Sequence, residues 1–240
     1  MRRAIALGVL ASALVAAGCS AARSADGGPV IDRDYQVGNF DRIELAGSYD
    51  TSVTTGSAPS VHARGDQKAI DNLEITVENG SLVVRPKQKM SWGWGSHHGK
   101  IALTVTVPSL RAAELAGSGN IDIDKVAGDS FSGAIAGSGN LQVGQVEVGT
   151  LKLDIAGSGN ARASGGRAKS ADYGIAGSGG IDAKGVAAET ASVSVAGSGG
   201  VQAQATGTAS VSIMGSGDVD LTGGAKCTIS KAGSGNARCS

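Results

Sequence analysis

Apolar and polar residues alternate along short segments of this chain, and the alternation returns at a nearly fixed interval. The segment 151–155 reads LKLDI, the segment 191–195 reads ASVSV and the segment 121–123 reads IDI. Alternation with a period of two predicts β-strands, because successive side chains of a strand point to opposite faces. Each of these segments is therefore expected to bury one face and expose the other.

A glycine-serine-glycine triplet separates the alternating segments. Successive triplets start 20, 20, 20, 20, 18 and 18 residues apart. A nearly fixed period of this length predicts a stacked solenoid, with glycine at the corner between two strands because it accepts a positive φ. The triplets are Gly117-Ser118-Gly119, Gly137-Ser138-Gly139, Gly157-Ser158-Gly159, Gly177-Ser178-Gly179, Gly197-Ser198-Gly199, Gly215-Ser216-Gly217 and Gly233-Ser234-Gly235.

Aligned on the triplets, the inward-facing residues form one apolar column on each side of the corner. The column before the corner is Leu115, Ile135, Ile155, Ile175, Val195 and Ile213, and the column after it is Ile121, Leu141, Ala161, Ile181, Val201 and Val219. Both columns keep their register where the repeat becomes shorter, so the shortening should lie in the other connection. A flexible glycine-serine linker would not keep such columns. The sequence therefore predicts an all-β, parallel β-helix-like solenoid with rungs of about 20 residues.

The first residues have the pattern of a bacterial export signal. A basic start precedes the apolar run Ala4–Ala17, which is too short to span a membrane. The run leads into Cys19 in the manner of a lipoprotein signal, so we expect residues 1–18 to be removed and Cys19 to be lipidated. Ala16 stands where such signals usually carry leucine, and ordinary secretion to the periplasm or the medium is the alternative.

The segment after Cys19 and the charge of the chain bear on its location and partners. Residues 19–35 are expected to be the anchor and tether, and Ser20 favours the outer membrane over retention at the inner one. Without Arg2 and Arg3, 19 basic residues face 21 acidic ones, a net charge of −2 that predicts no nucleic-acid partner. We expect an outer-membrane lipoprotein facing the periplasm or the outside, which contacts the membrane through its lipid alone.

Two cysteines lie in the last repeat. Cys227 aligns with inward-facing Ala209, and Cys239 aligns with inward-facing Leu221. An even pair in an oxidising compartment predicts a disulfide, here at the lumen of the final rung, and two buried thiols are the alternative. Lys231 takes the place that Ile213 has one rung earlier, so we also expect an inward-pointing charge that blocks the final strand edge.

The head, residues 36–240, is expected to have an irregular first part, residues 36–112, and a regular part, residues 113–240. The segment Arg42–Asp50 is an imperfect copy of one strand and corner. Its Gly47 lies several repeat lengths before Gly117, where the first regular triplet starts, and this gap predicts an insertion between the two.

The insertion has local signals of its own. We expect a short helix over Asp66–Leu73 with Asp66 as its N-cap, and a hairpin that turns at Asn79-Gly80. The alternating segment Ile101–Val107 predicts a further strand.

A segment rich in aromatic and histidine residues lies between these elements. It contains Trp92, Trp94, His97 and His98. Such residues are typical of a sugar-stacking platform or a transition-metal site, and an exposed hairpin loop is the alternative. Adjacent histidines do not aim at one metal, and no third ligand is evident, so we favour the plain loop and expect no metal site.

Motifs of enzymes and cofactor-binding proteins fail on their spacing. Ser118 lacks the upstream glycine of a nucleophile elbow, and the repeat is too long for a calcium-binding nonapeptide roll. No amphipathic helix follows a triplet, as a dinucleotide-binding fingerprint would require. We expect no cofactor. Asp218 and Asp220 are the closest carboxylate pair and would carry the alternative, a polysaccharide lyase or glycosidase.

Several segments together resemble a known family. They are Ile43–Asp50, the hairpin at Asn79-Gly80, the step Val107-Pro108 with Leu110, and the serial triplets. Over about residues 36–240 the chain is similar to the head GIN domain family, the head domain of autotransporter adhesins. The resemblance implies a right-handed β-helix-like solenoid in an exported bacterial protein, often a lipoprotein. It brings no catalytic residues.

The export signal, the ladder of repeats and the resemblance lead to one functional expectation. We expect a non-enzymatic cell-envelope protein whose solenoid head binds a polysaccharide or protein partner in the manner of an adhesin. The alternatives are a carbohydrate-active enzyme on the same scaffold and a structural spacer of the envelope. Because the repeats run to the last residues, we do not expect a self-exporting autotransporter.

Overall fold

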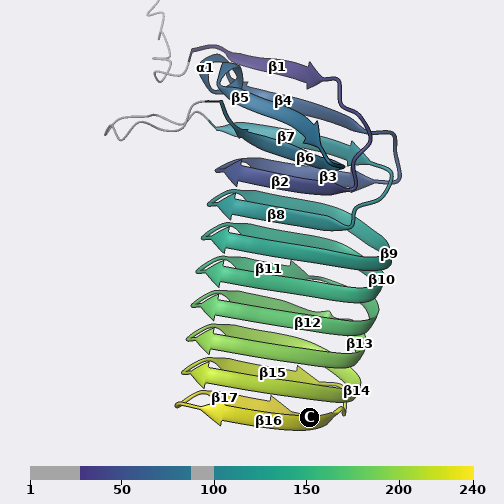
Figure 1. The fold of residues 1–240 in the computed structure, drawn as a ribbon, viewed down its shortest axis with the longest axis vertical. Coiled ribbons are helices and arrows are strands. Elements are labelled where there is room, and N and C mark those ends of the chain that lie inside the picture. The colour runs from purple at the N-terminus through teal and green to yellow at the C-terminus, as the bar shows by residue number, and fades with distance from the viewer. Residues whose placement is uncertain (1–27, 88–99) are drawn as a thin grey trace, which may run out of the picture.

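A computed structural model of the chain describes residues 28–87 and 100–240. It consists of strands and one short helix, α1 (Gln67–Asp71), and the strands stack into a rod (Figure 1). The strands are β1 (Val30–Tyr35), β2 (Arg42–Gly47), β3 (Asp50–Thr55), β4 (Ser60–Asp66), β5 (Leu73–Glu78), β6 (Ser81–Pro86), β7 (Ile101–Val107), β8 (Ala112–Gly117), β9 (Asn120–Gly137), β10 (Asn140–Gly157), β11 (Asn160–Ala163), β12 (Gly166–Gly177), β13 (Gly180–Gly197), β14 (Gly200–Gly215), β15 (Asp218–Thr222), β16 (Lys226–Ala232) and β17 (Asn236–Cys239). The predicted all-β solenoid is confirmed.

Consecutive rungs pair in parallel with the register that the triplets define. Residues of β9 pair with the equivalent residues of the next repeat in β10, so that Gly137 lies on Gly157. At the five corners from Ser138 to Ser216 a serine amide donates to the glycine carbonyl one rung earlier, as in the 2.9 Å bond from Ser158 N to Gly137 O. The corner is thus part of the hydrogen-bonded ladder, and its backbone groups are satisfied by the neighbouring rung.

Both apolar columns that the sequence predicts line the lumen. Every residue of the two columns is buried, including the small Ala161 among larger neighbours. The shortening of the later repeats also lies where it is expected, because the pairing of β13 with β14 shifts register between Ala183 and Thr190, away from the triplets. The corner side therefore stays regular along the rod while the opposite side absorbs the change.

The insertion builds the amino-terminal end of the rod. β2 pairs in parallel with β8, which places Gly47 on Gly117 across the whole insertion. β5 and β6 form the predicted hairpin, and its turn has positive φ at Asn79 (52°) and Gly80 (80°). The helix is shorter than expected, and Asp66 precedes it without making a side-chain cap hydrogen bond.

The start of the head differs from the expected boundary. The tether is expected at residues 19–35, yet Val30–Tyr35 form β1, which pairs antiparallel with β4. Ile31 and Tyr35 of this strand pack against the core, and their alternation with Asp32 and Asp34 satisfies the strand period. The head therefore begins by Val30 rather than at residue 36.

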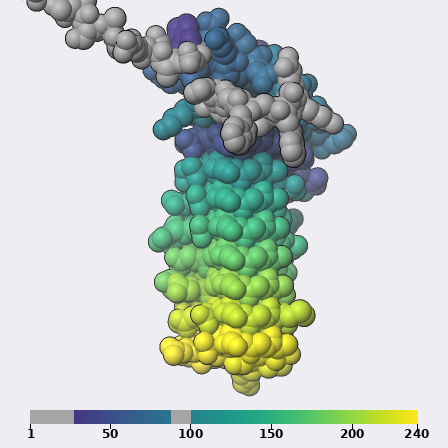
Figure 2. All heavy atoms as spheres, turned by 90° about the vertical axis from the view of Figure 1, so that its left-hand side faces the viewer, coloured from purple at the N-terminus to yellow at the C-terminus, as the bar shows by residue number. Residues whose placement is uncertain are grey.

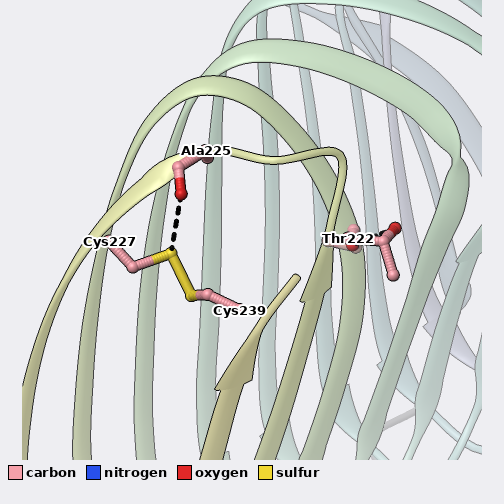
Figure 3. Close-up of a disulfide and its surroundings, with 5 residues drawn as sticks. Thr222, Ala225, Cys227 and Cys239 are labelled. Atoms are coloured by element: carbon pink, nitrogen blue, oxygen red, sulfur yellow. Dashed lines mark hydrogen bonds between the residues drawn. A yellow bond between two sulfur atoms is a disulfide. The ribbon is translucent and has the colours of Figure 1, made fainter.

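The final rung carries the disulfide and the lysine. Cys227 of β16 and Cys239 of β17 are bonded, with their Cα atoms 6.5 Å apart (Figure 3). The Ala225 carbonyl lies 3.7 Å from Cys227 Sγ, a contact rather than a hydrogen bond because a disulfide sulfur carries no proton. Lys231 does pair in register with Ile213, and its Nζ donates to the Gly235 carbonyl at 3.1 Å, so the charge lies over the open end.

Three buried hydroxyl groups have no hydrogen-bond partner among the described residues, those of Tyr35, Thr51 and Tyr173. Tyr173 is 2% exposed between Leu153 and Val193, and Thr51 is equally buried. Burial raises the pKa of Tyr173, because the charged phenolate would lose its water. A buried hydroxyl without a partner lowers stability.

Replacing Tyr173 with phenylalanine is therefore expected to raise the free energy of unfolding by about 1 kcal/mol, since the ring stays and the unsatisfied hydroxyl leaves. Urea unfolding of the two proteins measures the difference. Thr51→Val is an independent test of the same effect in β3, nearer the amino-terminal end of the rod. A loss of stability on Tyr173→Phe would show that the hydroxyl has a partner such as a buried water.

Candidate binding surface

On the outer surface beside the corner, the residue that precedes each triplet recurs from rung to rung. An alanine precedes every triplet except one, which Met214 precedes instead. Strand pairing places these residues directly above one another, and their side chains are exposed. We call the residues before the first six triplets, Ala116, Ala136, Ala156, Ala176, Ala196 and Met214, the alanine ladder. Figure 2 looks onto the side of the rod where the corners lie and shows side chains stacked in columns.

A shallow groove of about 540 Å³ follows the alanine ladder. Its floor is apolar because the next outward positions are also small, such as Ala134 and Gly174. Glu114, Asp154 and Ser194 lie in its lining, which contains no aromatic or basic side chain. The groove is therefore suited to an apolar or weakly cationic ligand segment and offers no counter-charge to an anion.

Asp154 is the charged residue nearest the middle of this groove. Lys152 Nζ lies 2.7 Å from Asp154 Oδ2, and the hydrogen bond raises the pKa of Lys152. The carboxylate also leans over Gly174, since a Cβ at that position would meet Asp154 Oδ1. Gly174 thus keeps the groove open where a larger side chain would fill it.

On the other side of the corner, amide side chains form a hydrogen-bonded ladder. Asn120 Nδ2 donates to Asp50 Oδ1 at 2.6 Å, Asn140 donates to Asn120 at 2.8 Å and Asn160 donates to Asn140 at 3.2 Å. Glycines at positions 180 and 200 interrupt it before it resumes at Asp218 and Asn236. Stacked amides of this kind stabilise neighbouring rungs and leave few polar groups free for a ligand.

A second hollow, of about 330 Å³, lies where the amide ladder is interrupted. It contains Asp218 and Asp220, the carboxylate pair that the enzyme alternative requires. Asp218 Oδ1 accepts from both the backbone N and the Nδ2 of Asn236, at 3.0 and 3.1 Å. The carboxylate of Asp218 is therefore a hydrogen-bond acceptor within the amide ladder. The described residues contain no group of three side chains able to hold a metal ion.

The corner opposite the triplets is charged. A third hollow, of about 680 Å³, includes Glu147 and Arg167, whose carboxylate and guanidinium lie 2.9 Å apart, with Asp129, Lys169 and Glu189 nearby. Both signs of charge are interspersed along this corner. It has the character of an ordinary solvated face.

Some residues that the sequence singles out fall outside the described part of the chain. Cys19 lies there, as do Trp92, Trp94, His97 and His98. The structure instead places the triplet residues in one column and the two cysteines in one bond. The apolar columns do not predict the alanine ladder, although the alanine before most triplets is visible in the sequence. Across residues 28–87 and 100–240, no helix combines the length and apolar character needed to cross a membrane.

Comparisons with known proteins identify a family and several similar structures. A family model described as "Putative auto-transporter adhesin, head GIN domain" matches residues 39–225. A putative adhesin from Bacteroides fragilis NCTC 9343 has a similar structure, with a TM-score of 0.78, 21% identity and coverage of 88% of this chain and 97% of that chain. No match was found among curated proteins.

Two further solved structures share the fold. A putative lipid binding protein from Parabacteroides distasonis ATCC 8503 is 26% identical, with a TM-score of 0.71 and coverage of 89% of this chain and 98% of that chain. A putative adhesin from Parabacteroides merdae ATCC 43184 is 22% identical, with a TM-score of 0.68 and coverage of 89% and 97%. The similarity in each case extends over nearly the whole of the other chain.

Proposed function

This chain belongs to the head GIN domain family, whose description is "Putative auto-transporter adhesin, head GIN domain", and on that basis we propose that it is a non-enzymatic binding head of the cell envelope. The observation that carries the proposal is the apolar groove along the alanine ladder. An exposed apolar strip on a rigid scaffold is typical of an interaction site. Its partner is a protein or polysaccharide of the envelope that lies along the rod.

A lipid ligand is the second candidate function. One structural neighbour, 26% identical to this chain, bears the name of a putative lipid binding protein. The groove has the chemistry that an acyl chain requires, because exposed methyl groups follow one another from Ala116 to Ala196 and Met214, 68% exposed, continues the strip. Burying such methyl groups against a hydrocarbon chain is favourable in proportion to the area removed from water.

The proposal includes export of the chain and its anchoring to the outer membrane. The amino-terminal signal and Cys19 support a lipoprotein of the outer membrane, with residues before β1 as the tether. β1 and α1 lie at one end of the rod and the disulfide rung lies at the other (Figure 1). An anchor before β1 would leave the groove and the far end free to meet a partner.

The groove is tested by Ala156→Arg, which places a long charged side chain in the middle of the alanine ladder. We expect the variant to bind isolated envelopes at least about tenfold more weakly than the native protein, a change of about 1.4 kcal/mol. Gln142→Arg is the matched control, because Gln142 of the same strand, β10, is exposed on the other side of the corner and does not line the groove. A fluorescent fatty acid, titrated into the same three proteins, separates the lipid candidate from a macromolecular partner.

Two outcomes would contradict the proposal. Equal envelope binding by the native protein and Ala156→Arg would exclude the groove as the binding surface. Turnover of an envelope polysaccharide that Asp218→Ala or Asp220→Ala abolishes would show an enzyme instead.

A further inference from the structure

β1 is the strand through which the head continues from the amino-terminal segment. It pairs antiparallel with β4 along Val30 to Tyr35, and among the described strands β4 is the one that it contacts along its length. A strand with one neighbour is held less firmly than the strands of an inner rung, which are paired above and below. Side chains that join β1 to the rest of the head therefore matter to its stability.

His62 of β4 joins the two strands on their outer face. Its Nδ1 lies 2.8 Å from Asp34 Oδ1 and its Nε2 lies 3.1 Å from Asp32 Oδ1. Ionised carboxylates only accept hydrogen bonds, so both ring nitrogens must carry a proton for both bonds to exist. The arrangement therefore requires the imidazolium form of His62, because a neutral ring has one donor nitrogen.

The other charged groups around His62 do not replace it. Arg64 Nη1 lies 3.5 Å from both oxygens of Asp32, a longer contact that leaves Asp34 to the histidine. On the far side, β7 presents Ala102, Thr104 and Thr106, none of which titrates.

An ion pair on the other face of β1 also holds this strand, and it does not depend on pH near neutrality. Arg33 Nη2 donates to Asp71 Oδ1 of α1 at 2.7 Å. The guanidinium stays charged over the physiological range. His62 is therefore the one titratable link between β1 and the described remainder of the head in this range.

We propose that His62 is a proton-operated clasp, which fastens β1 to β4 while the imidazole is charged and loosens β1 when the imidazole is neutral. Loosening β1 uncovers the backbone edge of β4 and lengthens the connection between the head and the amino-terminal segment. An uncovered strand edge accepts a strand from another chain.

The direction of the pH dependence follows from the contacts. Hydrogen bonds to Asp34 and then to Asp32 raise the pKa of His62 above its ordinary value. A raised pKa in the folded state means that the clasp contributes its full stability below about pH 6.5, the ordinary histidine value. The contribution is lost as the pH rises through the pKa of the folded protein.

Hydrogen exchange of the β1 amides, corrected for the intrinsic effect of pH, tests the clasp. We expect severalfold weaker protection at pH 8 than at pH 5.5 in the native protein. His62→Gln should show the weak protection at both pH values, and His62→Arg, which stays charged, should show pH-independent protection. Ser60→Ala is the matched control, since Ser60 lies on the same face of β4 and bonds to Thr106 instead.

An NMR titration of the His62 ring measures its pKa directly. A purely structural role of His62 would leave this pKa unchanged. We expect a pKa above 6.5 that falls in Asp34→Asn, because the neutral amide no longer attracts the imidazolium. A native pKa at or below 6.5, or a β1 protection profile in the native protein that matches His62→Gln, would overturn the proposal.

Discussion

Replacing Gly157 with alanine is expected to lower the free energy of unfolding by roughly 3 kcal/mol or more. Gly157 has a φ of 133°, a conformation that L-residues rarely adopt, and a Cβ there would meet the Gly137 carbonyl oxygen. That oxygen accepts the corner hydrogen bond from Ser158. The alanine would thus strain its own backbone and also separate two rungs.

Gly128 is the matched control for this effect. It has the same φ of 133°, but a Cβ there would meet nothing within 4 Å. Gly128→Ala should therefore show the backbone strain without the separation of rungs, and Ser158→Ala, at a corner position, should change stability by less than about 0.5 kcal/mol. The urea midpoints of the three variants give the order of their stabilities. Equal midpoints for Gly157→Ala and Gly128→Ala would show that the close approach of the rungs does not matter.

Removing the disulfide, in a Cys227→Ala/Cys239→Ala protein, is expected to have the second largest effect. The bond closes a loop with a sequence separation of 12, and a loop of that order contributes about 3 kcal/mol in the chain-entropy model. Solenoids are held together between neighbouring rungs, so we expect the loss to appear first in the last rung. Hydrogen exchange should show that β16 and β17 lose protection while β10 keeps it.

Thiol counting on the oxidised, denatured protein gives an independent check of the disulfide. Cys227 and Cys239 should not react with a thiol reagent until a reductant is added. Two reactive thiols before reduction would contradict the bond. Reduction that lowers the protection of β10 as much as that of β16 would contradict the local character of its effect.

The regular part of the rod could be predicted because its period fixes every contact between rungs. Once Gly137 is aligned with Gly157, the inward position of Ile155 and the pairing of Cys227 with the column of Ala209 both follow. The shortening of the later repeats could also be placed, because the columns on the corner side kept their register. The sequence carries this information redundantly, once in each repeat.

The irregular parts could be predicted less completely than the regular part, because their contacts join segments without a common period. The place of β1 in the head could not be predicted, because its burial depends on β4, an antiparallel partner that is distant in sequence. The same pairing brings His62 to its two aspartates. The alanine ladder could not be predicted as a binding surface for a different reason, since a repeated alanine shows the period of the chain but does not show that a groove follows it.

The position of β2 and β3 within the rod has a consequence for the order in which the chain folds. This first rung is paired on one side with β6 and β7 and on the other with β8 and β9, all of which follow it in sequence. Contacts between segments so far apart in the chain form slowly, because the entropy of closing a long loop is lost before the contacts stabilise it. Later rungs need only the rung before them. We therefore expect a single slow nucleation step that brings β2 and β3 together with β6, β7, β8 and the start of β9, followed by rapid addition of the repeats in the order of synthesis.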